Sequence, residues 1–234
     1  MDLKSYVNQL LFGYYPYVCL AVFFAGSLIR FDREQYTWKS DSSQFLRHGQ
    51  LRWASNLFHI GVLGIFGGHL TGFLTPVAVW HAIGVSLPEK QMTAMMAGGV
   101  FGTMCTVGLA MLLTRRLRDS RIRASSGPMD LLVLFLLLAQ VILGLAGIPI
   151  SAQHPDGLEM LKFMQWAQRI WTFRGGAAEL VADVSIVFKL HMVLGLTVFL
   201  VFPFTRLVHI WSGFASVFYL FRPYQLMRSR GGNR

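Results

Sequence analysis

Residues 56–74, NLFHIGVLGIFGGHLTGFL, form an apolar run that contains two histidines and that continues to Trp53 and Thr75. A helix needs about 20 predominantly apolar residues to span a bilayer, so this stretch predicts a transmembrane helix. Imidazoles at membrane depth are costly and usually face the interior of a helical bundle. His59 and His69 therefore indicate a membrane helix whose histidines face other helices or a ligand in the interior of the bundle.

The composition of the whole chain also indicates a membrane protein. Of its 234 residues, 54% are hydrophobic and 14% are charged, whereas charged residues make up about 25% of an ordinary soluble domain. No long polar block remains for a second unit, so residues 1–234 are interpreted as a single integral-membrane domain. We predict an all-α, polytopic bundle of five transmembrane helices at about 7–29, 53–75, 93–113, 130–150 and 184–211.

Lys and Arg are distributed unevenly between the two sides of this predicted bundle. Fifteen of the 21 fall after the first and third runs or in the C-terminal segment, and five fall on the opposite side. Because cytoplasmic segments carry the excess of Lys and Arg, this pattern places the N-terminus outside and the C-terminus in the cytoplasm. Residues at about 212–234 then form a basic cytoplasmic tail. The formal charge of +10 reflects topology and does not indicate nucleic acid.

Four histidines fall within the predicted helices, two on the second and two on the fifth: His59, His69, His191 and His209. A haem with two histidine ligands needs one imidazole from each of two facing helices, so two such pairs would hold two haems b. The second and fifth helices run in opposite directions. Residues at matching depths are therefore His59 with His209, and His69 with His191.

The spacing of the two pairs is unequal. At 1.5 Å per residue, the histidines are ~15 Å apart along the second helix and ~27 Å apart along the fifth. At ~100° per residue, His191 and His209 share one face, whereas His59 and His69 lie about 80° apart. Pro203 is expected to kink the fifth helix, and tilt and this kink would have to absorb the difference in length.

Glycines and arginines near the histidines each allow two interpretations. The glycines either admit a flat porphyrin to the backbone or serve ordinary helix packing; they are Gly61, Gly64, Gly67, Gly68 and Gly195. The arginines either hold the propionates of the inner haem or contribute only to topology; they are Arg115, Arg116 and Arg206. Separately, the stretch at 157–171, GLEMLKFMQWAQRIW, is amphipathic and predicts a short helix at the membrane interface.

Several stretches resemble the gamma subunit of membrane-bound respiratory nitrate reductase, over about residues 14–225. These stretches are ASNLFHIGVLGIFGGHLTGFLTP (54–76), SAQHPDG (151–157), FPFTRLVHIW (202–211), GSLIRFDREQYTW (26–38) and KLHMVLGLTVFLVFPF (189–204). The resemblance implies a dihaem cytochrome b of the bacterial cytoplasmic (inner) membrane. Such a subunit oxidises a membrane quinol and passes the electrons, through the outer and then the inner haem, to an Fe–S subunit and a molybdenum catalytic subunit.

The resemblance also assigns roles to individual residues. It implies that His69 and His191 ligate the distal, outer haem and that His59 and His209 ligate the proximal, inner one. The quinol site would involve Gly68, His69 and Lys90. The chain shows no site for nitrate or molybdenum, so it is not expected to reduce nitrate alone. Its partners would be the two cytoplasmic subunits, the quinol and the lipid bilayer, and its basic segments would dock the subunits or serve topology.

Three other functions remain open on the sequence. One is the dihaem subunit of another quinol-linked enzyme, such as a formate dehydrogenase, a hydrogenase or a heterodisulfide-type complex. The second is a haem-free transporter in which the four helix histidines form a proton or metal path. The third is a structural anchor for a peripheral enzyme. Reduced-minus-oxidised spectra and the identity of the co-purifying partner separate these functions.

Overall fold

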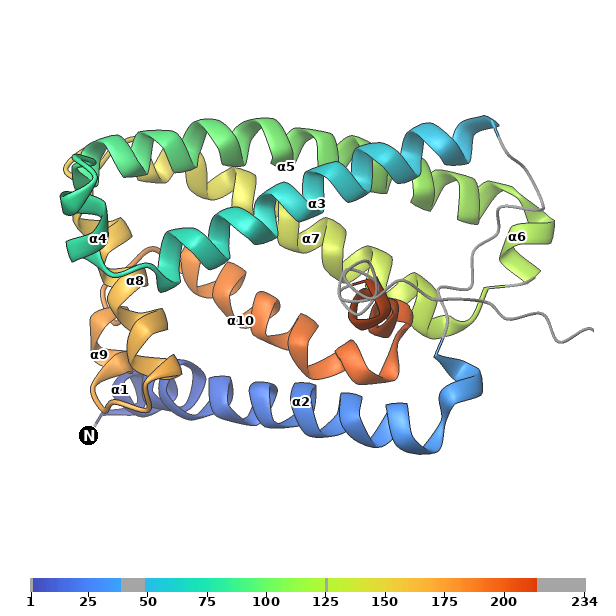
Figure 1. Ribbon diagram of the computed structural model, residues 1–234, viewed down its shortest axis with the longest axis horizontal. Helices are drawn as coiled ribbons and strands as arrows, with labels where there is room; N and C mark the ends of the chain where they lie inside the picture. Colours follow the sequence, from blue (N-terminus) through green and yellow to red (C-terminus); the bar gives the residue numbers. More distant parts are fainter. Residues whose placement is uncertain (1, 39–48, 125, 214–234) are drawn as a thin grey trace, which may run out of the picture.

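The computed structural model describes residues 2–38, 49–124 and 126–213. Five long helical segments cross the molecule in alternating directions (Figure 1). The first consists of α1, the π-helical segment η1 and α2, which follow one another without a break. The bounds are α1 (Leu3–Gln9), η1 (Leu10–Tyr14), α2 (Tyr15–Arg33), α3 (Gly49–Leu74), α5 (Leu87–Arg118), α7 (Pro128–Ser151) and α10 (Ile186–Val201).

Shorter helices lie at the two ends of the bundle. One end, called here the α8 end, holds α4 (Val77–Ala82), α8 (Leu158–Trp171) and α9 (Ala177–Leu180). The opposite end, the α6 end, holds α6 (Ser120–Ala124), and the 3-10 turn η2 (Gln35–Thr37) follows α2 there. The helix predicted within 157–171 is confirmed as α8.

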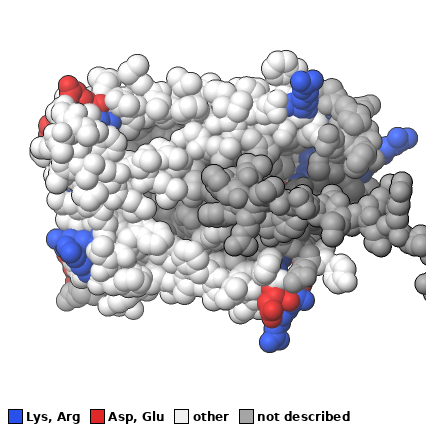
Figure 2. Space-filling view, in the orientation of Figure 1, with Lys and Arg blue, Asp and Glu red and all other residues white. Residues whose placement is uncertain are grey.

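The five long segments are long and apolar enough to cross a membrane. Figure 2 shows the Lys, Arg, Asp and Glu side chains at the two ends of the molecule, with an uncharged surface between them on this face. The prediction of an all-α bundle with five membrane-spanning helices is therefore confirmed. Which end faces the cytoplasm stays a prediction, and the predicted basic tail lies outside the described residues from 214 onward.

The long helices pack in the order α3, α5, α7, α10 and α2. The closest approach is between α3 and α5. A Cβ on Gly61 would lie 2.6 Å from the backbone nitrogen of Cys105, and a Cβ on Gly108 would lie 2.4 Å from that of Phe58. These glycines let the two backbones touch, as small residues do in membrane helix pairs. Among the described residues, α3 packs mainly on α5 and α8, whereas α10 packs mainly on α7 and α2.

The start of α5 corrects the predicted boundary at residue 93. Ser86 and Glu89 form a capping box, in which the Ser86 backbone N–H donates to Glu89 Oε2 (2.8 Å) and Pro88 stands in the first turn. This signal is visible in the sequence, because Ser-x-x-Glu marks a helix start. Lys90, predicted to lie in a loop, is therefore in the first turn of α5.

The fifth run corrects a second expectation, because it is not one kinked helix over 184–211. The α-helix ends at Val201, the 3-10 turn η3 (Phe202–Phe204) contains Pro203, and Thr205 is extended. A second 3-10 turn, η4 (Arg206–Val208), leads to His209. Pro203 cannot donate a backbone hydrogen bond, so the helix stops here. The axial spacing and shared face predicted for His191 and His209 do not apply.

Buried apolar clusters hold both ends of the bundle. At the α6 end, side chains from α2 and α7 pack on the segment that follows α10: Phe23, Val133, Phe202, Leu207 and Val208. At the α8 end, η1 packs on the segment around α9: Phe12, Ala178, Val181 and Val184. These clusters hold the segments that precede and follow α10, which carries His191.

Candidate functional site

The rings of His69 on α3 and His191 on α10 lie close together and are tilted to one another. Their ring centroids are 6.1 Å apart and their planes are inclined by 43°. A metal lies about 2 Å from an imidazole nitrogen and the ring centre about 1 Å further, so two imidazoles on one iron have centroids roughly 6 Å apart. The main packing partners of α3 are α5 and α8, and those of α10 are α7 and α2, so these imidazoles join two helices that pack chiefly on others. The pair meets the spacing that a bis-histidine haem requires.

All four helix histidines bond a backbone carbonyl through Nδ1. Because a carbonyl oxygen only accepts, each Nδ1 carries the proton and each Nε2 keeps its lone pair, which is the form that binds a metal. The acceptors are Ser55 for His59 (2.7 Å), Ile65 for His69 (2.8 Å), Gln140 for His191 (3.1 Å) and Arg206 for His209 (2.6 Å).

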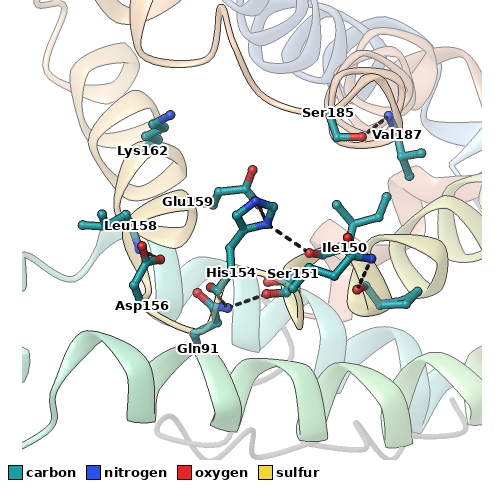
Figure 3. Close-up of polar contacts among 12 residues, drawn as sticks. Gln91, Ile150, Ser151, His154, Asp156, Leu158, Glu159, Lys162, Ser185 and Val187 are labelled. Carbon is teal, nitrogen blue, oxygen red and sulfur yellow. Dashed lines mark hydrogen bonds and ion pairs between the residues drawn. The ribbon is translucent and has the colours of Figure 1, made fainter.

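This bond alone does not mark a ligand, because His154 makes a similar one. Its Nδ1 lies 3.3 Å from the Ile150 carbonyl oxygen and 3.9 Å from Glu159 Oε2 (Figure 3). His154 lies beyond the end of α7 and is exposed. Within the described ranges, no group of three or more His, Cys, Asp and Glu side chains is placed to hold a metal ion. A haem site of the proposed kind needs only two protein ligands, so facing pairs are the relevant feature.

The glycines divide between the two interpretations that the sequence left open. Gly61 and Gly64 serve packing, since a Cβ on Gly64 would lie 2.5 Å from the Phe101 ring. A Cβ on Gly67 or Gly68 would meet no atom within 4 Å, so this side of α3 next to His69 has room for a flat group. Gly195 accommodates a protein side chain, because its Cβ would lie 2.9 Å from Gln140 Nε2.

The sequence interpretation missed the contribution of α7. It drew ligands from the second and fifth helices alone, but Gln140 on α7 supplies the carbonyl that orients His191. Gly144, one turn further along α7, leaves space for the imidazole: a Cβ there would lie 3.0 Å from His191 Cε1. The sequence did offer one signal for this role, because Gln140 is a polar residue within the most apolar of the five runs, Pro128–Ser151.

His59 and His209 belong to different parts of the α6 half of the bundle. His59 is exposed on α3, with Ser55 Oγ 3.2 Å from its Nδ1. His209 is half-buried and follows η4. Their sharing of one iron stays a prediction.

Two of the three arginines predicted near the inner pair meet at one carboxylate. Asp130, at the start of α7, lies 3.2 Å from Arg116 Nη1 and 3.4 Å from Arg206 Nε. Arg115 and Arg116 are buried, with 7% and 8% of their surface exposed. The Arg206 carbonyl accepts the hydrogen bond from His209, so this charged cluster is joined directly to the histidine. Two guanidinium groups on one carboxylate leave net positive charge here.

Lys90 is buried at the α8 end, with only 5% of its surface exposed. Its Nζ lies 3.2 Å from Met164 Sδ on α8 and 5.4 Å from the centre of the Trp80 ring. A Cβ on Gly72, one turn beyond His69, would lie 4.0 Å from Nζ. A thioether is a weak acceptor, so a buried ammonium with these neighbours is suited to bind an oxygen of a ligand.

Amide side chains hold the helix ends around this lysine. Gln91 Nε2 donates to the carbonyl oxygens of Ser151 (2.9 Å) and His154 (2.8 Å), which closes the end of α7 (Figure 3). Gln168 on α8 donates to Phe73 and Thr75 at the end of α3 (3.0 and 3.3 Å). These bonds satisfy carbonyls that a helix C-terminus leaves without partners. They also fix α3, α5, α7 and α8 relative to one another.

The sequence of this chain was compared with those of known protein families. Residues 8–230 match the sequence profile of the nitrate reductase gamma subunit family. The chain belongs to this family. The resemblance inferred from the sequence is thereby confirmed, and all four helix histidines lie within the matched range.

Relatives of the gamma-subunit family cover this chain nearly end to end. It is 52% identical over 229 residues to the respiratory nitrate reductase 2 gamma chain of Escherichia coli (strain K12), and 50% identical over 226 residues to the respiratory nitrate reductase 1 gamma chain of the same organism. Both alignments cover 97% of this chain and 99% of the relative. The nitrate reductase gamma chain of Bacillus subtilis (strain 168) is 37% identical over 223 residues, covering 95% and 99%.

Proposed function

We propose that this gamma-family chain is the quinol-oxidising, dihaem cytochrome b subunit of a respiratory nitrate reductase in the bacterial inner membrane. The observation that carries this proposal is the His69–His191 pair, whose ring centroids are 6.1 Å apart and whose Nδ1 atoms each bond a backbone carbonyl. His69 and His191 would hold the outer haem, and His59 and His209 the inner one. Bound there, two haems b supply one-electron transfer from the quinol toward the partner subunits.

Lys90, Gly68 and His69 form the proposed quinol site at the α8 end. The buried Lys90 ammonium is placed to hydrogen-bond a quinol oxygen and to stabilise negative charge there as the O–H bond breaks. Gly68 leaves room for the ring beside α3, since a Cβ at this position would meet no atom within 4 Å. The site lies at one end of the bundle, so protons released there can reach the aqueous phase on that side.

The topology gives the reaction its energetic consequence. With the α8 end outside, protons leave outward while electrons travel toward the α6 end. Moving one elementary charge across the whole membrane stores ~2.3 kcal/mol per 100 mV. The chain would thus contribute to energy conservation, with nitrate reduction itself taking place on a partner subunit.

The α6 end is the proposed docking side for the Fe–S and molybdenum subunits. Supporting this, the relatives are named as gamma chains of nitrate reductases, a name that implies further subunits. The described basic residues at this end include Arg118, Arg121 and Arg123, which follow one another at the end of α5 and in α6. Positive charge here suits acidic surfaces of a cytoplasmic partner.

The test counts haems in membranes that contain the complete complex. His69→Ala and His191→Ala should each remove the same haem, from two per chain to one, and should abolish quinol-driven reduction of the other. His154→Ala is the matched control, because this histidine makes a similar Nδ1 contact but has no facing imidazole. It should keep both haems. Complexes that show no cytochrome b absorption would overturn the proposal and favour a haem-free transporter.

A further inference from the structure

A reciprocal contact joins α7 and α10 around His191. Gln140 and Gly144 stand one turn apart on α7, and His191 and Gly195 stand one turn apart on α10. A Cβ on Gly144 would lie 3.0 Å from His191 Cε1, and a Cβ on Gly195 would lie 2.9 Å from Gln140 Nε2. Each glycine leaves the space that the side chain of the opposite helix occupies.

Gln140 contacts both nitrogens of the His191 ring. Its carbonyl accepts from Nδ1 at 3.1 Å, and its side-chain Nε2 lies 3.4 Å from His191 Nε2. Iron bound to Nε2 would take the lone pair that faces this amide, so beside a haem the Gln140 side chain would act by packing against the ring. Among the described residues, the other three helix histidines form hydrogen bonds to groups within their own helix or in the turn just before them. The plane of the His191 ring is therefore set by a different helix from the one that carries it.

The chemistry of Gln140 argues against a purely packing role. Its Oε1 is buried and has no hydrogen-bond partner among the described atoms. Leaving a buried acceptor unsatisfied costs about 1–3 kcal/mol, and an apolar residue of the same shape avoids this cost. In a helix as apolar as α7, leucine or methionine would give a more stable contact. A role beside the imidazole therefore accounts for an amide at this position better than helix packing alone does.

We infer that Gln140 is a positioning residue for the outer haem site: with Gly144 and Gly195, it fixes the plane of the His191 imidazole relative to that of His69. This inference rests on the proposed function, because it concerns an axial ligand of the proposed distal haem. The angle between two axial imidazole planes determines the g-values of a low-spin ferric haem. That angle is therefore measurable without reference to turnover.

The experiment records the electron paramagnetic resonance spectrum and haem content of the complete complex. Gln140→Leu and Gln140→Met should each retain two haems per chain, shift the g-values of one haem signal and leave the other signal unchanged. The shifted signal should be the one that His69→Ala removes. Gly144→Ala should shift the same signal, because its methyl group presses on the ring. Gly98→Ala on α5, where a Cβ would meet no atom within 4 Å, is the control and should shift neither.

The outcomes separate this inference from the proposed function. If His69→Ala removes no haem, the proposed function fails. If His69→Ala removes one haem but neither signal moves in the Gln140 variants, only the positioning role fails. Should Gln140→Leu not accumulate, Gln140→Met and Gln140→Asn decide. The methionine keeps the volume without the amide and should shift the signal, whereas the asparagine keeps an amide and should move it less. Equal shifts from both would overturn the inference.

Discussion

Arg30 donates hydrogen bonds from Nη1 to the carbonyl oxygens of Pro203 (2.6 Å) and Thr205 (2.8 Å). Pro203 interrupts the fifth span, so its neighbours have carbonyls that no helix satisfies. The guanidinium also donates from Nη2 to the Thr37 carbonyl at 2.8 Å, which joins η2 to the same group. A single side chain from the first span thus holds the turn that leads to His209.

Arg30→Gln is expected to destabilise the α6 end of the chain. Hydrogen bonds to a charged group contribute about 1.5–3 kcal/mol, and two carbonyls would lose their donor. Thermal unfolding in detergent should show this loss, and the spectrum of the proposed inner haem should weaken before that of the outer one. Arg33→Gln, an exposed substitution one turn later, is the control. Equal thermal stability of the two variants would contradict the role of Arg30.

Much of the fold was predictable from the sequence, because a membrane restricts the secondary structure that a long apolar run can adopt. Long apolar runs must be helices in lipid, and all five were found. The end of α10 was harder, since Pro203 predicts a disturbance but does not distinguish a kink from a break. That distinction depends on Arg30, which lies 173 residues away in the chain. Likewise, Gln140 could not be assigned to His191 without knowing that α7 lies against α10.

Gly61→Ala and Gly108→Ala are expected to separate α3 from α5. Each added methyl group would lie under 3 Å from backbone atoms of the opposite helix, and backbone cannot move aside cheaply. Overpacking of this kind costs typically 1–3 kcal/mol. The melting temperature in detergent should fall for both variants. Gly98→Ala, in open space, should melt like the parent chain, and a matching fall there would show that helix propensity or expression explains the result.

Asp130→Asn is expected to destabilise the junction of α5, α7 and η4. The exposed fractions of the Arg116, Asp130 and Arg206 side chains are 9%, 15% and 18%. Removing one partner of a largely buried ion pair costs about 3 kcal/mol, because the remaining charges stay desolvated. Equilibrium unfolding measures this change. Asp32→Asn, on the exposed surface of α2, should cost little, and comparable losses in both variants would contradict a specific network.

The Lys162–Asp183 ion pair gives a weak pH dependence at the α8 end. The hydrogen bond from Lys162 Nζ (2.6 Å) holds the pKa of Asp183 below its ordinary value. A carboxyl with a lowered folded-state pKa adds stability above the unfolded pKa of about 4, and this contribution is lost as the pH falls through the folded pKa.

The size of this effect is expected to be small, because Asp183 is 68% exposed and Lys162 is 35% exposed. Exposed pairs contribute at most about 1 kcal/mol. Asp183→Asn should lower the melting temperature slightly at pH 7, and this difference should shrink as the pH falls through the lowered folded pKa of Asp183. Glu179→Gln, an exposed carboxylate on neighbouring α9, is the reference. If the melting temperatures of the parent and of Asp183→Asn differ by the same amount at every pH, the ion pair is not the cause of the difference.

The Nδ1 bonds imply an order in which the histidine rings become oriented as the chain folds. His59 and His69 donate to carbonyls one turn back on α3, so these imidazoles acquire their tautomer as soon as that helix forms. His191 depends on α7, and its ring is set only once the fourth and fifth spans have met. The ring of His191 is therefore oriented later than those on α3, and the facing pair is complete only when the last span has packed.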